Sequence, residues 1–221
     1  MTTTKRKKSG LFISFEGGEG SGKTTQIGHL VSWLNVEKLK VMVTRQPGGT
    51  AIGAKLREIV LDPRHRALSP RAELLLYEAD RAQHVDEALR PALDRGTILV
   101  SDRFADSSTV YQGICRKLGV DWVIKLNDFA TGDLNPDLVI LLDVSEKAAR
   151  ARIKKRGSLD RIERETSEFH RKVRRGFLTL AKRFPKRFVV LNGELCEQAL
   201  ASDIQAIVRE RLTRRGIWKT T

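Results

Sequence analysis

A phosphate-binding pattern near the start of the chain limits the fold more than any other feature. Residues 15–26 read FEGGEGSGKTTQ, in which Gly17, four residues and then Gly22-Lys23-Thr24 form the pattern G-x-x-x-x-G-K-[ST]. An apolar run precedes the pattern and a helical pattern follows it, so we expect the loop to join a strand to a helix. The pattern predicts a nucleoside triphosphate site, but it leaves open which molecule receives the terminal phosphate.

The residue types of this loop suit its chemistry. Glycine lets backbone N–H groups approach phosphate oxygens without a side chain in the way, and the first turn of the helix adds its own N–H groups. Lys23 is expected to bridge the outer phosphates, and the Thr24 hydroxyl is expected to bind Mg²⁺. The residues expected to hold the triphosphate here are Gly17, Gly18, Glu19, Gly20, Ser21, Gly22, Lys23, Thr24 and Thr25.

The chain is strongly basic, with a formal net charge of +14 over 221 residues. Such a charge suits either nucleic-acid binding or a basic cleft for phosphorylated substrates. Much of the excess lies in the N-terminal KRKKSG, in residues 150–175 and in the C-terminal RERLTRRGIWKTT. Because no nucleic-acid-binding motif accompanies it, we expect no nucleic-acid partner. Residues 1–10 are expected to form a disordered basic tail and residues 11–221 a single domain.

The cysteine and apolar content indicate a cytoplasmic protein. Cys115 and Cys196 have neither C-x-x-C spacing nor the neighbours of a metal site, so we expect two reduced thiols. No apolar run approaches the ~18 residues of a membrane span, and the first residues lack the apolar centre of a signal peptide. We therefore expect no membrane partner.

Apolar runs alternate with helical patterns along the chain. The predicted strands are residues 11–16, 40–44, 97–102, 137–144 and 187–192. The predicted helices cover about 23–36, 51–61, 70–95, 105–116, 120–130, 145–155, 163–184 and 195–214, with a bend at Pro91. This alternation predicts an α/β fold, a parallel sheet with helices on both faces.

Two acidic residues end predicted strands, at the edge where open α/β sheets bind ligands. Asp102 is followed by Arg103, so one strand end offers a carboxylate for a magnesium shell and a guanidinium for an acceptor phosphate. Thr24 and Asp102 are the expected metal ligands. For Asp143, two interpretations stay open: a metal ligand, or the cap of the helix that begins in DVSE.

A second group of residues suits recognition of an acceptor base. Tyr77 and Arg81 are four residues apart on the long helix and share one face. An aromatic ring beside a guanidinium can stack on a planar base and hydrogen-bond its edge. The alternative is a tyrosine at the edge of the core beside a solvated arginine.

The segment FADSSTVYQG follows Arg103 and adds hydroxyl and amide groups. Ser107 shares a helical face with Tyr111, and Ser108 shares one with Gln112. These side chains would read the edges of a base or sugar, or would satisfy one another.

Five motifs, in order, resemble the thymidylate kinase family: GGEGSGKTTQ, TRQPGGT, LLYEADRAQH, DRFADSSTVYQG and RGSLDRIERE. The resemblance extends from Leu11 to about Leu212, and TRQPGGT and DRFADSSTVYQG separate this family from other nucleoside monophosphate kinases. It implies transfer of the γ-phosphoryl group of ATP to dTMP with Mg²⁺, giving dTDP for dTTP synthesis. It also implies a P-loop NTPase-type five-stranded parallel sheet flanked by helices, and a homodimer.

The resemblance assigns roles on the acceptor side. Tyr77 would stack on thymine, Arg81 would bond its edge, and Tyr111 would crowd the sugar 2′ position and so favour a deoxynucleotide. Arg45 and Arg103 would hold the acceptor phosphate. The full expected acceptor set is Arg45, Pro47, Tyr77, Arg81, Arg103, Ser107, Ser108, Tyr111, Gln112, Asp160 and Glu163.

One position departs from the family pattern. The bacterial motif usually reads T-R-E-P-G-G-T, and Gln46 replaces its glutamate here. Glutamine keeps the shape and the hydrogen-bonding reach but loses the charge. Any role of a carboxylate at this position, near magnesium or Arg45, is therefore in doubt. We still expect activity, because the other phosphate-handling positions match.

The basic segment RARIKKRGSLDRIERE resembles a mobile lid, at about residues 150–164. Arg152 and Arg156 are four residues apart, and Gly157 follows as a hinge or helix stop. The resemblance favours closure of Arg152, Arg156 and Arg161 over the ATP phosphates. The variable positions of the phosphate loop carry no basic residue, so Arg156 is our first choice for the catalytic arginine.

The expected reaction is phosphoryl transfer, in which the protein positions the reactants and stabilises charge. The expected catalytic residues are Lys23, Asp102, Arg103 and Arg156. Asp160 and Glu163 share a face and would orient the arginines or the acceptor. A P-loop ATPase or switch is the rival interpretation, but it leaves the second, acceptor-reading set unexplained. Another monophosphate or nucleoside acceptor is the third.

Overall fold

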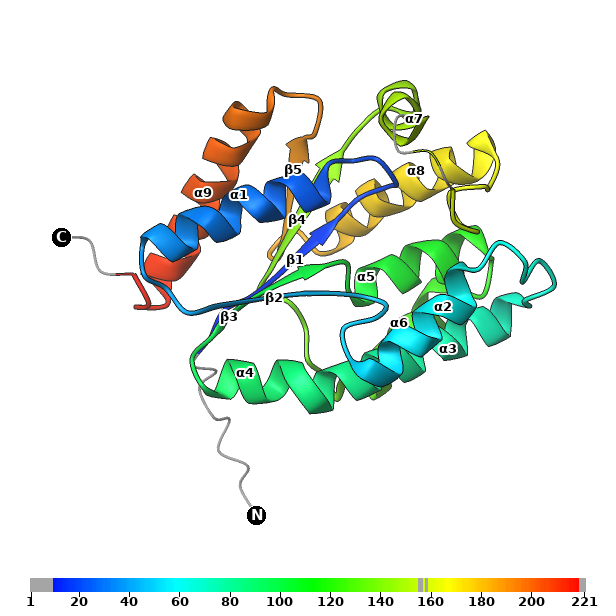
Figure 1. Cartoon of the computed structure of the whole chain (residues 1–221), viewed down its shortest axis with the longest axis horizontal. Coiled ribbons are helices and arrows are strands. Elements are labelled where there is room, and N and C mark those ends of the chain that lie inside the picture. Colours follow the sequence, from blue (N-terminus) through cyan, green and yellow to red (C-terminus); the bar gives the residue numbers. More distant parts are fainter. Residues whose placement is uncertain (1–9, 155–156, 158, 219–221) are drawn as a thin grey trace, which may run out of the picture.

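Five parallel strands form the centre of the molecule, in the order β2-β3-β1-β4-β5 (Figure 1). The structure is a computed structural model that describes residues 10–154, 157 and 159–218, so the prediction of a disordered tail lies mostly outside the described residues. The strands are β1 (Phe12–Glu16), β2 (Val41–Arg45), β3 (Ile98–Asp102), β4 (Leu138–Asp143) and β5 (Phe188–Asn192). The five predicted strands and their parallel arrangement are confirmed, with bounds that differ by one residue at most ends.

Helices cover both faces of the sheet (Figure 1). The α-helices are α1 (Lys23–Val36), α2 (Ala51–Leu61), α3 (Pro70–His84), α4 (Arg90–Asp94), α5 (Ala105–Ser108), α6 (Val120–Thr131), α7 (Glu146–Lys154), α8 (Ser167–Arg183) and α9 (Glu197–Arg214). Two wider π-helical segments, η1 (Val85–Leu89) and η2 (Thr109–Cys115), continue α3 and α5. Among the described residues, no helix is long and apolar enough to span a membrane.

Side-chain caps set several helix starts. Thr50 accepts a hydrogen bond from the Gly53 N–H at the start of α2, and Ser69 accepts one from Ala72 at the start of α3. Thr166 caps α8 in the same way, so this helix begins at Ser167 and not at 163 as predicted. Residues 161–164, which precede α8, form turns.

The long predicted helix is interrupted by a change of helix type before Pro91. Proline at this position has no N–H to donate, and the wider η1 turn lies directly before α4. The sequence identified the place of the irregularity but not its π-helical form.

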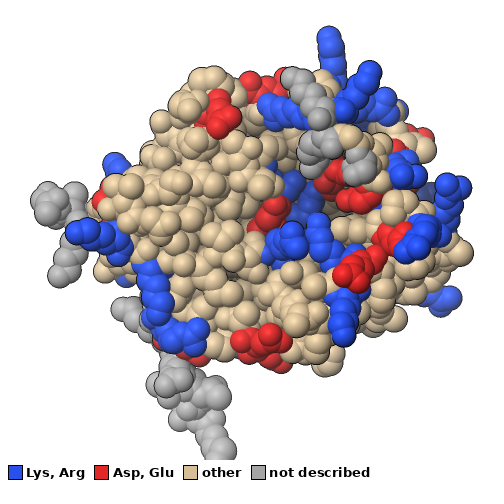
Figure 2. Space-filling view, viewed as in Figure 1, with Lys and Arg blue, Asp and Glu red and all other residues tan. Residues whose placement is uncertain are grey.

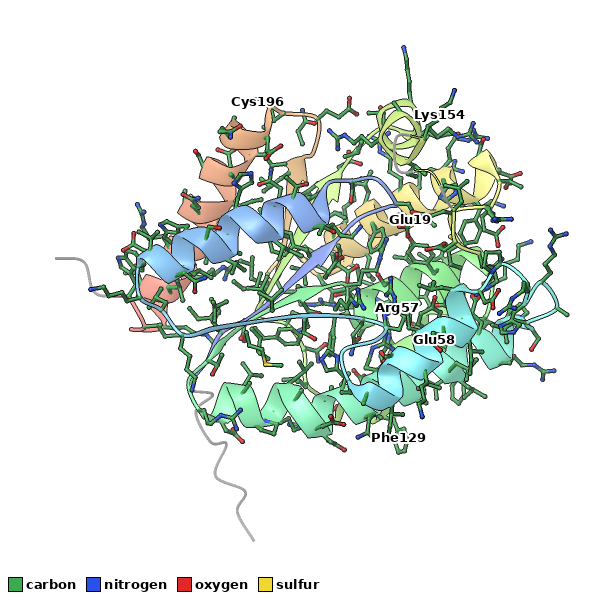
Figure 3. All side chains as sticks on the ribbon, viewed as in Figure 1. Glu19, Arg57, Glu58, Phe129, Lys154 and Cys196 are labelled. Atoms are coloured by element: carbon green, nitrogen blue, oxygen red, sulfur yellow. The ribbon has the colours of Figure 1, made fainter. Side chains whose placement is uncertain are left out.

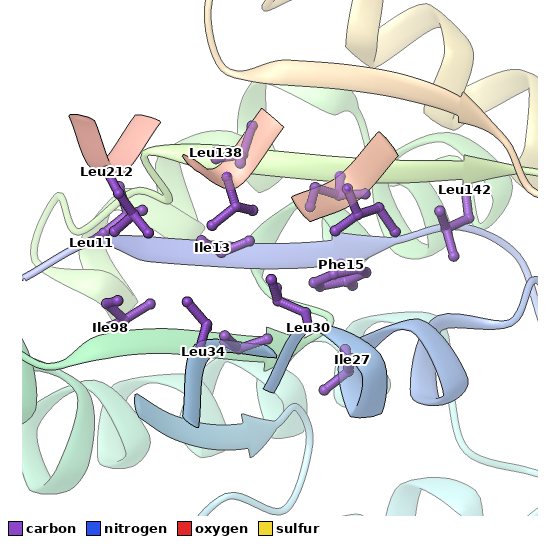
Figure 4. Packing of buried hydrophobic residues seen from close by; sticks show 14 of the residues in the cluster. Leu11, Ile13, Phe15, Ile27, Leu30, Leu34, Ile98, Leu138, Leu142 and Leu212 are labelled. Carbon is purple, nitrogen blue, oxygen red and sulfur yellow. The ribbon is translucent and has the colours of Figure 1, made fainter. Parts of the chain in front are cut away.

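Apolar side chains fill the space on each face of the sheet. On one face, Ile13 and Phe15 of β1 pack with Leu30 of α1 and Leu212 of α9, all almost fully buried (Figure 4). On the other face, Leu141 of β4 packs with α8 and η2, and β1 and β3 pack with η1 and α4. The two cores hold the sheet rigidly, so the loops after β1, β2 and β3 meet at one edge in fixed positions.

Candidate active site

The phosphate loop lies between β1 and α1, as predicted. Gly17 has a φ of 140°, and a Cβ there would lie 2.7 Å from the Leu142 carbonyl oxygen, so the close turn requires glycine. Gly22 caps α1 in the left-handed region. The Lys23 ammonium lies over the loop and donates to the Gly17 and Gly18 carbonyls at 3.2 and 3.1 Å. Burial, reinforced by nearby Arg103, lowers the pKa of Lys23.

Thr24 and Asp102 meet at the end of β3, where the sequence places the metal ligands. The Thr24 hydroxyl donates to Asp102 Oδ2 at 3.2 Å. Two oxygens this close at the mouth of a phosphate loop fit a magnesium shell that phosphate oxygens and waters would complete. Both residues line a cleft of about 870 Å³.

This main cleft is lined by the phosphate loop, by the ends of β2 and β3 and by lid residues. In the space-filling view, basic and acidic side chains gather in a hollow between the α7 side of the molecule and α2 (Figure 2). Its cationic lining residues are Lys23, Arg45, Arg57, Arg103 and Arg152. The concentration of cations around the loop suits two phosphorylated ligands meeting end to end.

Arg103 stands at the junction of the two halves of the site. Its Nη1 donates to the Gly17 carbonyl at 2.9 Å, and its Nη2 donates to Glu19 Oε1 at 2.6 Å. The Tyr111 hydroxyl donates to the same Glu19 oxygen at 3.1 Å, and the Arg103 guanidinium lies 5.2 Å from the Tyr111 ring centre. The structure therefore turns Glu19, expected on the ATP side, toward the acceptor side.

Burial alone would raise the pKa of Glu19, but Arg103 and Lys23 lower it to about 2. The behaviour of Glu16, at the end of β1, is the opposite: burial and the nearby Asp106 raise its pKa to about 7. Glu16 accepts hydrogen bonds from the Phe104 N–H at 2.8 Å and the Ser107 hydroxyl at 2.7 Å. The Ser107 hydroxyl thus ties the segment after β3 to Glu16.

A smaller cavity of about 90 Å³ adjoins the main cleft and has the composition of a base slot. Its lining includes Tyr77, Phe104 and Pro47, together with Arg81 and Gln112. The rings supply apolar surface for stacking, while the guanidinium and amide supply hydrogen bonds. The predicted acceptor residues Pro47, Tyr77, Arg81, Arg103, Ser107, Ser108, Tyr111, Gln112 and Asp160 all line this slot.

Gln46, the departure from the family pattern, lies buried beneath the slot. Its Oε1 accepts from Arg81 Nε at 3.1 Å, and its amide nitrogen contacts His84 Nδ1 at 3.1 Å. Because arginine can only donate, the amide oxygen must face Arg81, and the amide N–H then faces an unprotonated His84 Nδ1. His84 Nε2 lies 2.7 Å from the Thr44 hydroxyl. The Gln46 side chain is therefore hydrogen-bonded to Arg81, the arginine that the resemblance assigns to the base.

Comparison with known proteins agrees with this geometry. The sequence model of the thymidylate kinase family matches residues 15–204. A thymidylate kinase from an Exiguobacterium species is 43% identical over 211 residues, which is 96% of this chain and 100% of the relative. Thymidylate kinases from Deinococcus radiodurans and Thermoanaerobacter sp. are 47% and 45% identical, over 91% and 92% of this chain and 98% and 99% of their own lengths.

The chain belongs to the thymidylate kinase family. Enzymes of this family phosphorylate dTMP at the expense of a nucleoside triphosphate, which accounts for two ligand cavities that share one wall. The five-stranded sheet agrees with the family fold.

The lid that the thymidylate kinase resemblance implies is only partly described, because Arg156 lies outside the described residues. Arg152 of α7 reaches the phosphate loop, where its Nη1 donates to the Gly20 and Ser21 carbonyls and its Nη2 donates to the Gly193 carbonyl at 2.9 Å. It lines the main cleft, as expected of an arginine on the ATP side.

Arg161 does not lie where a lid arginine over the ATP phosphates was expected. Its Nη2 lies 2.5 Å from Glu73 Oε2 of α3, and its Nε donates to the Val60 carbonyl at 2.8 Å. The physical reason is the carboxylate of Glu73, which is 1% exposed and needs cationic partners. Arg161 is thus an anchor of the lid segment in this structure.

Asp160 and Glu163 form a reciprocal cap within the lid segment. Asp160 Oδ1 accepts from the Glu163 N–H at 2.8 Å, and Glu163 Oε2 accepts from the Asp160 N–H at 3.2 Å. Both residues also line the main cleft.

Asp143 makes a bidentate ion pair with Arg174, at 2.6 and 2.9 Å, and Ser145 caps α7 in its place. The sequence led us to expect that Asp143 would either bind a metal or cap this helix, and neither expectation describes the ion pair with Arg174.

Sequence reasoning missed several residues that line the two cavities, among them Phe104 and Arg57. Arg57 of α2 lines both cavities and donates to the Pro47 carbonyl at 2.8 Å. Figure 3 labels it on α2, across the opening from Glu19 of the phosphate loop. An arginine on an amphipathic helix is ordinarily a solvated charge, so only the folded position of α2 against the TRQPGGT turn could have identified it.

Proposed function

We propose that this protein transfers the γ-phosphoryl group of ATP to dTMP with Mg²⁺, giving ADP and dTDP for dTTP synthesis. The observation that carries the proposal is the shared wall between the phosphate-loop cleft and the base slot. Five residues line both cavities: Glu19, Gln46, Arg57, Arg103 and Asp160. A donor nucleotide held by the loop and an acceptor held in the slot would therefore present their phosphates to each other across Arg103.

On the donor side, the phosphate loop and the N-terminus of α1 would hold the ATP phosphates, with Lys23 bridging them. Lys23 now donates to loop carbonyls, so a phosphate would replace these weaker partners with charged ones. Thr24 and Asp102 would hold Mg²⁺, which supplies charge neutralisation between the phosphates when bound. Arg152 would lie beside the loop on the side of Gly193.

On the acceptor side, Arg103 and Arg45 would hold the phosphate of dTMP. Arg45 ends β2 and lines the main cleft with an exposed side chain. Tyr77 would stack on thymine and Arg81 would bond its edge, while Gln112 completes the rim of the slot. Tyr111 would stand against the sugar, its hydroxyl fixed by Glu19 at 3.1 Å.

The protein's contribution to catalysis would be position and charge. Arg103 is rigid, because it is hydrogen-bonded to the loop and ion-paired with Glu19. Although burial disfavours its charge, Glu19, Tyr111 and Glu16 hold the pKa of Arg103 above its ordinary value. A fixed cation between the two phosphates reduces their repulsion without reorganising during the reaction.

We propose further that the protein is a homodimer through α3 and α6. These helices pack together and carry large exposed apolar side chains: Phe129 is 86%, Leu75 59% and Trp122 58% exposed. Phe129 projects from the surface in Figure 3. Such a patch is typical of an interface. Sedimentation should give a dimer that Phe129→Glu converts toward monomer, and a monomeric wild type would contradict the proposal.

The test of function is a coupled ADP-release assay with ATP, Mg²⁺ and a panel of nucleoside monophosphates. We expect dTMP to give the highest kcat/KM and to raise ATP turnover at least about a hundredfold over hydrolysis without acceptor. Product analysis should identify dTDP. ATP turnover that ignores dTMP would favour the ATPase or switch interpretation instead.

A further inference from the structure

Arg81, the arginine at the edge of the base slot, is 2% exposed, and its donors face four partners. Its Nε donates to Gln46 Oε1 at 3.1 Å, and its Nη2 donates to Ser108 Oγ at 2.9 Å. Its Nη1 donates to Glu78 Oε1 at 2.6 Å and to Asn127 Oδ1 at 3.0 Å. The guanidinium is therefore held in one orientation by α3 itself, by the turn after β2 and by two other helices.

A buried guanidinium needs a counter-charge, because taking a charge out of water costs several kcal/mol if it is left unpaired. Of the four partners, Glu78 alone carries a carboxylate, and its bond to Arg81 is the shortest of the set. The neighbouring carboxylate of Asp80 is turned toward the Gly48 N–H, which it accepts at 2.9 Å. Neutralisation of Arg81 thus falls to Glu78.

Glu78 is arranged for this task and not for contact with a substrate. It is 7% exposed, it precedes Arg81 by three residues on α3, and it does not line the base slot. Its second oxygen, Oε2, is buried without a hydrogen-bond partner. Burying an oxygen without a hydrogen bond costs desolvation free energy. The ion pair of Glu78 with Arg81 offsets this cost.

A glutamate in place of Gln46 would bring a second carboxylate to the guanidinium of Arg81. Its Oε1 already accepts from Arg81 Nε, so a glutamate oxygen at this place would make a charged bond without moving. With Glu78 present, that second charge would leave two carboxylates on one guanidinium, and one of them would be uncompensated.

We propose that Glu78 is the positioning residue that neutralises and orients Arg81 for reading the base, and that it supplies the negative charge which Gln46 lacks. The inference rests on the proposed function, because it assigns Arg81 to the base of dTMP. It makes positions 46 and 78 two alternative sources of one charge.

The test compares Glu78→Gln, Gln46→Glu and the double variant with the wild type. Titration calorimetry gives Kd for dTMP, and the coupled assay gives kcat and KM. Glu78→Gln should raise Kd and KM for dTMP at least about tenfold, the loss of one charged hydrogen bond, while kcat at saturation changes less than about threefold. Adding Gln46→Glu should return Kd to within about threefold of wild type.

Controls separate positioning from folding. Glu58→Gln, on the exposed surface of α2, should leave Kd, KM and melting temperature unchanged. Gln46→Glu alone should lower the melting temperature, and should do so more than in the Glu78→Gln background. A merely structural role of Glu78 predicts a lower melting temperature with unchanged Kd.

The outcomes are decisive in each case. Glu78→Gln that folds and binds dTMP within about twofold of wild type overturns the inference. If Glu78→Gln does not fold, the double variant decides: rescue supports the shared charge, and failure to fold or to bind contradicts it. A wild type that does not phosphorylate dTMP overturns the proposed function as well, whereas normal wild-type turnover with unaffected variants overturns this inference alone.

Discussion

The carboxylate of Glu73 on α3 forms a buried ion pair with the guanidinium of Arg161, with 2.5 Å between Oε2 and Nη2. Glu73 Oε1 also accepts from the Gln112 amide at 2.8 Å. One buried carboxylate therefore holds both the lid segment and a side chain on the rim of the base slot. Arg116, the residue directly after η2, joins it and in turn pairs with Glu165 of the lid segment at 2.6 Å.

Arg161→Ala should act mainly on stability and lid position. Removing one partner of a buried pair leaves Glu73 undercompensated, although Arg116 and Gln112 remain beside it. We expect a loss of about 2 to 4 kcal/mol in the free energy of unfolding, measured in urea, and less than about a tenfold fall in kcat. Arg164→Ala, an exposed neighbour, is the matched control and should change neither. A hundredfold fall in kcat with normal stability would return Arg161 to the ATP phosphates.

The position of Arg161 shows which structural features sequence patterns could predict and which they could not. Alternating apolar runs placed all five strands, and cap residues such as Ser69 placed helix starts, because both signals are local. The partner of Arg161 is a glutamate 88 positions away, and nothing near either residue indicates that they meet. In the same way, Glu19 reads as part of a phosphate loop, and only the fold reveals that it pairs with Arg103.

Variants of Tyr111 should separate its ring from its hydroxyl. The ring is 6% exposed and packs against Phe169 and Phe177, with centroids 6.1 Å apart in each case. Tyr111→Phe keeps this packing, so the ratio of deoxy to ribo activity should stay within about twofold. Tyr111→Ala should lower that ratio at least about tenfold, at a cost of about 3 to 5 kcal/mol in stability.

The measurement for Tyr111 is kcat/KM for dTMP and for the ribonucleotide, at a temperature where circular dichroism shows each variant folded. If Tyr111→Ala keeps the wild-type ratio while its dTMP turnover falls, the ring does not select the sugar. If Tyr111→Phe keeps the ratio of deoxy to ribo activity but both variants bind dTMP more weakly, the hydrogen bond between the Tyr111 hydroxyl and Glu19 contributes to dTMP binding.

His84 should make stability depend on pH in the mildly acid range. It is fully buried, and burial lowers its pKa from 6.5 to about 4, with Glu87 opposing and Arg81 reinforcing the shift. Between these values the unfolded chain binds a proton that the folded protein does not. The contribution of His84 is thus present above pH 6.5 and is lost as pH falls toward 4. The loss amounts to at most about 3 kcal/mol.

His84→Gln removes this titration and leaves the other acidic groups unchanged. Urea unfolding at several pH values should therefore give a wild-type curve that falls more steeply with acid than the variant's curve between pH 6.5 and 4. Parallel curves would mean that His84 has the same pKa in the folded and in the unfolded protein. Gln46→Glu offers a second check: it replaces the amide N–H that faces His84 Nδ1 with an acceptor, so it should raise the pKa of His84 seen by NMR.

The source of the catalytic arginine is the remaining question. Charge that develops on the transferred phosphoryl group needs a nearby cation. The charged side chain at the variable positions of the phosphate loop is the carboxylate of Glu19, which is paired with Arg103. Among the described residues, Arg152 is the lid arginine that lines the cleft, and its guanidinium is hydrogen-bonded to the Gly20, Ser21 and Gly193 carbonyls. Arg156, four residues after Arg152 in the sequence, lies outside the described residues and remains our first choice.

Arg156→Ala should lower kcat at least about a hundredfold, since an arginine finger contributes about 10³- to 10⁵-fold and Arg152 can cover part of the loss. The Kd for dTMP should stay within about threefold of wild type, because Arg45 and Arg103 hold its phosphate. Arg152→Ala is the matched comparison and should raise KM for ATP more than it lowers kcat, given its bonds to loop carbonyls. Single-turnover kinetics at saturating ATP and dTMP measures the chemical step in each variant. A near-normal rate for Arg156→Ala would count against this residue, and near-normal rates for Arg152→Ala and Arg161→Ala as well would end the lid-arginine mechanism.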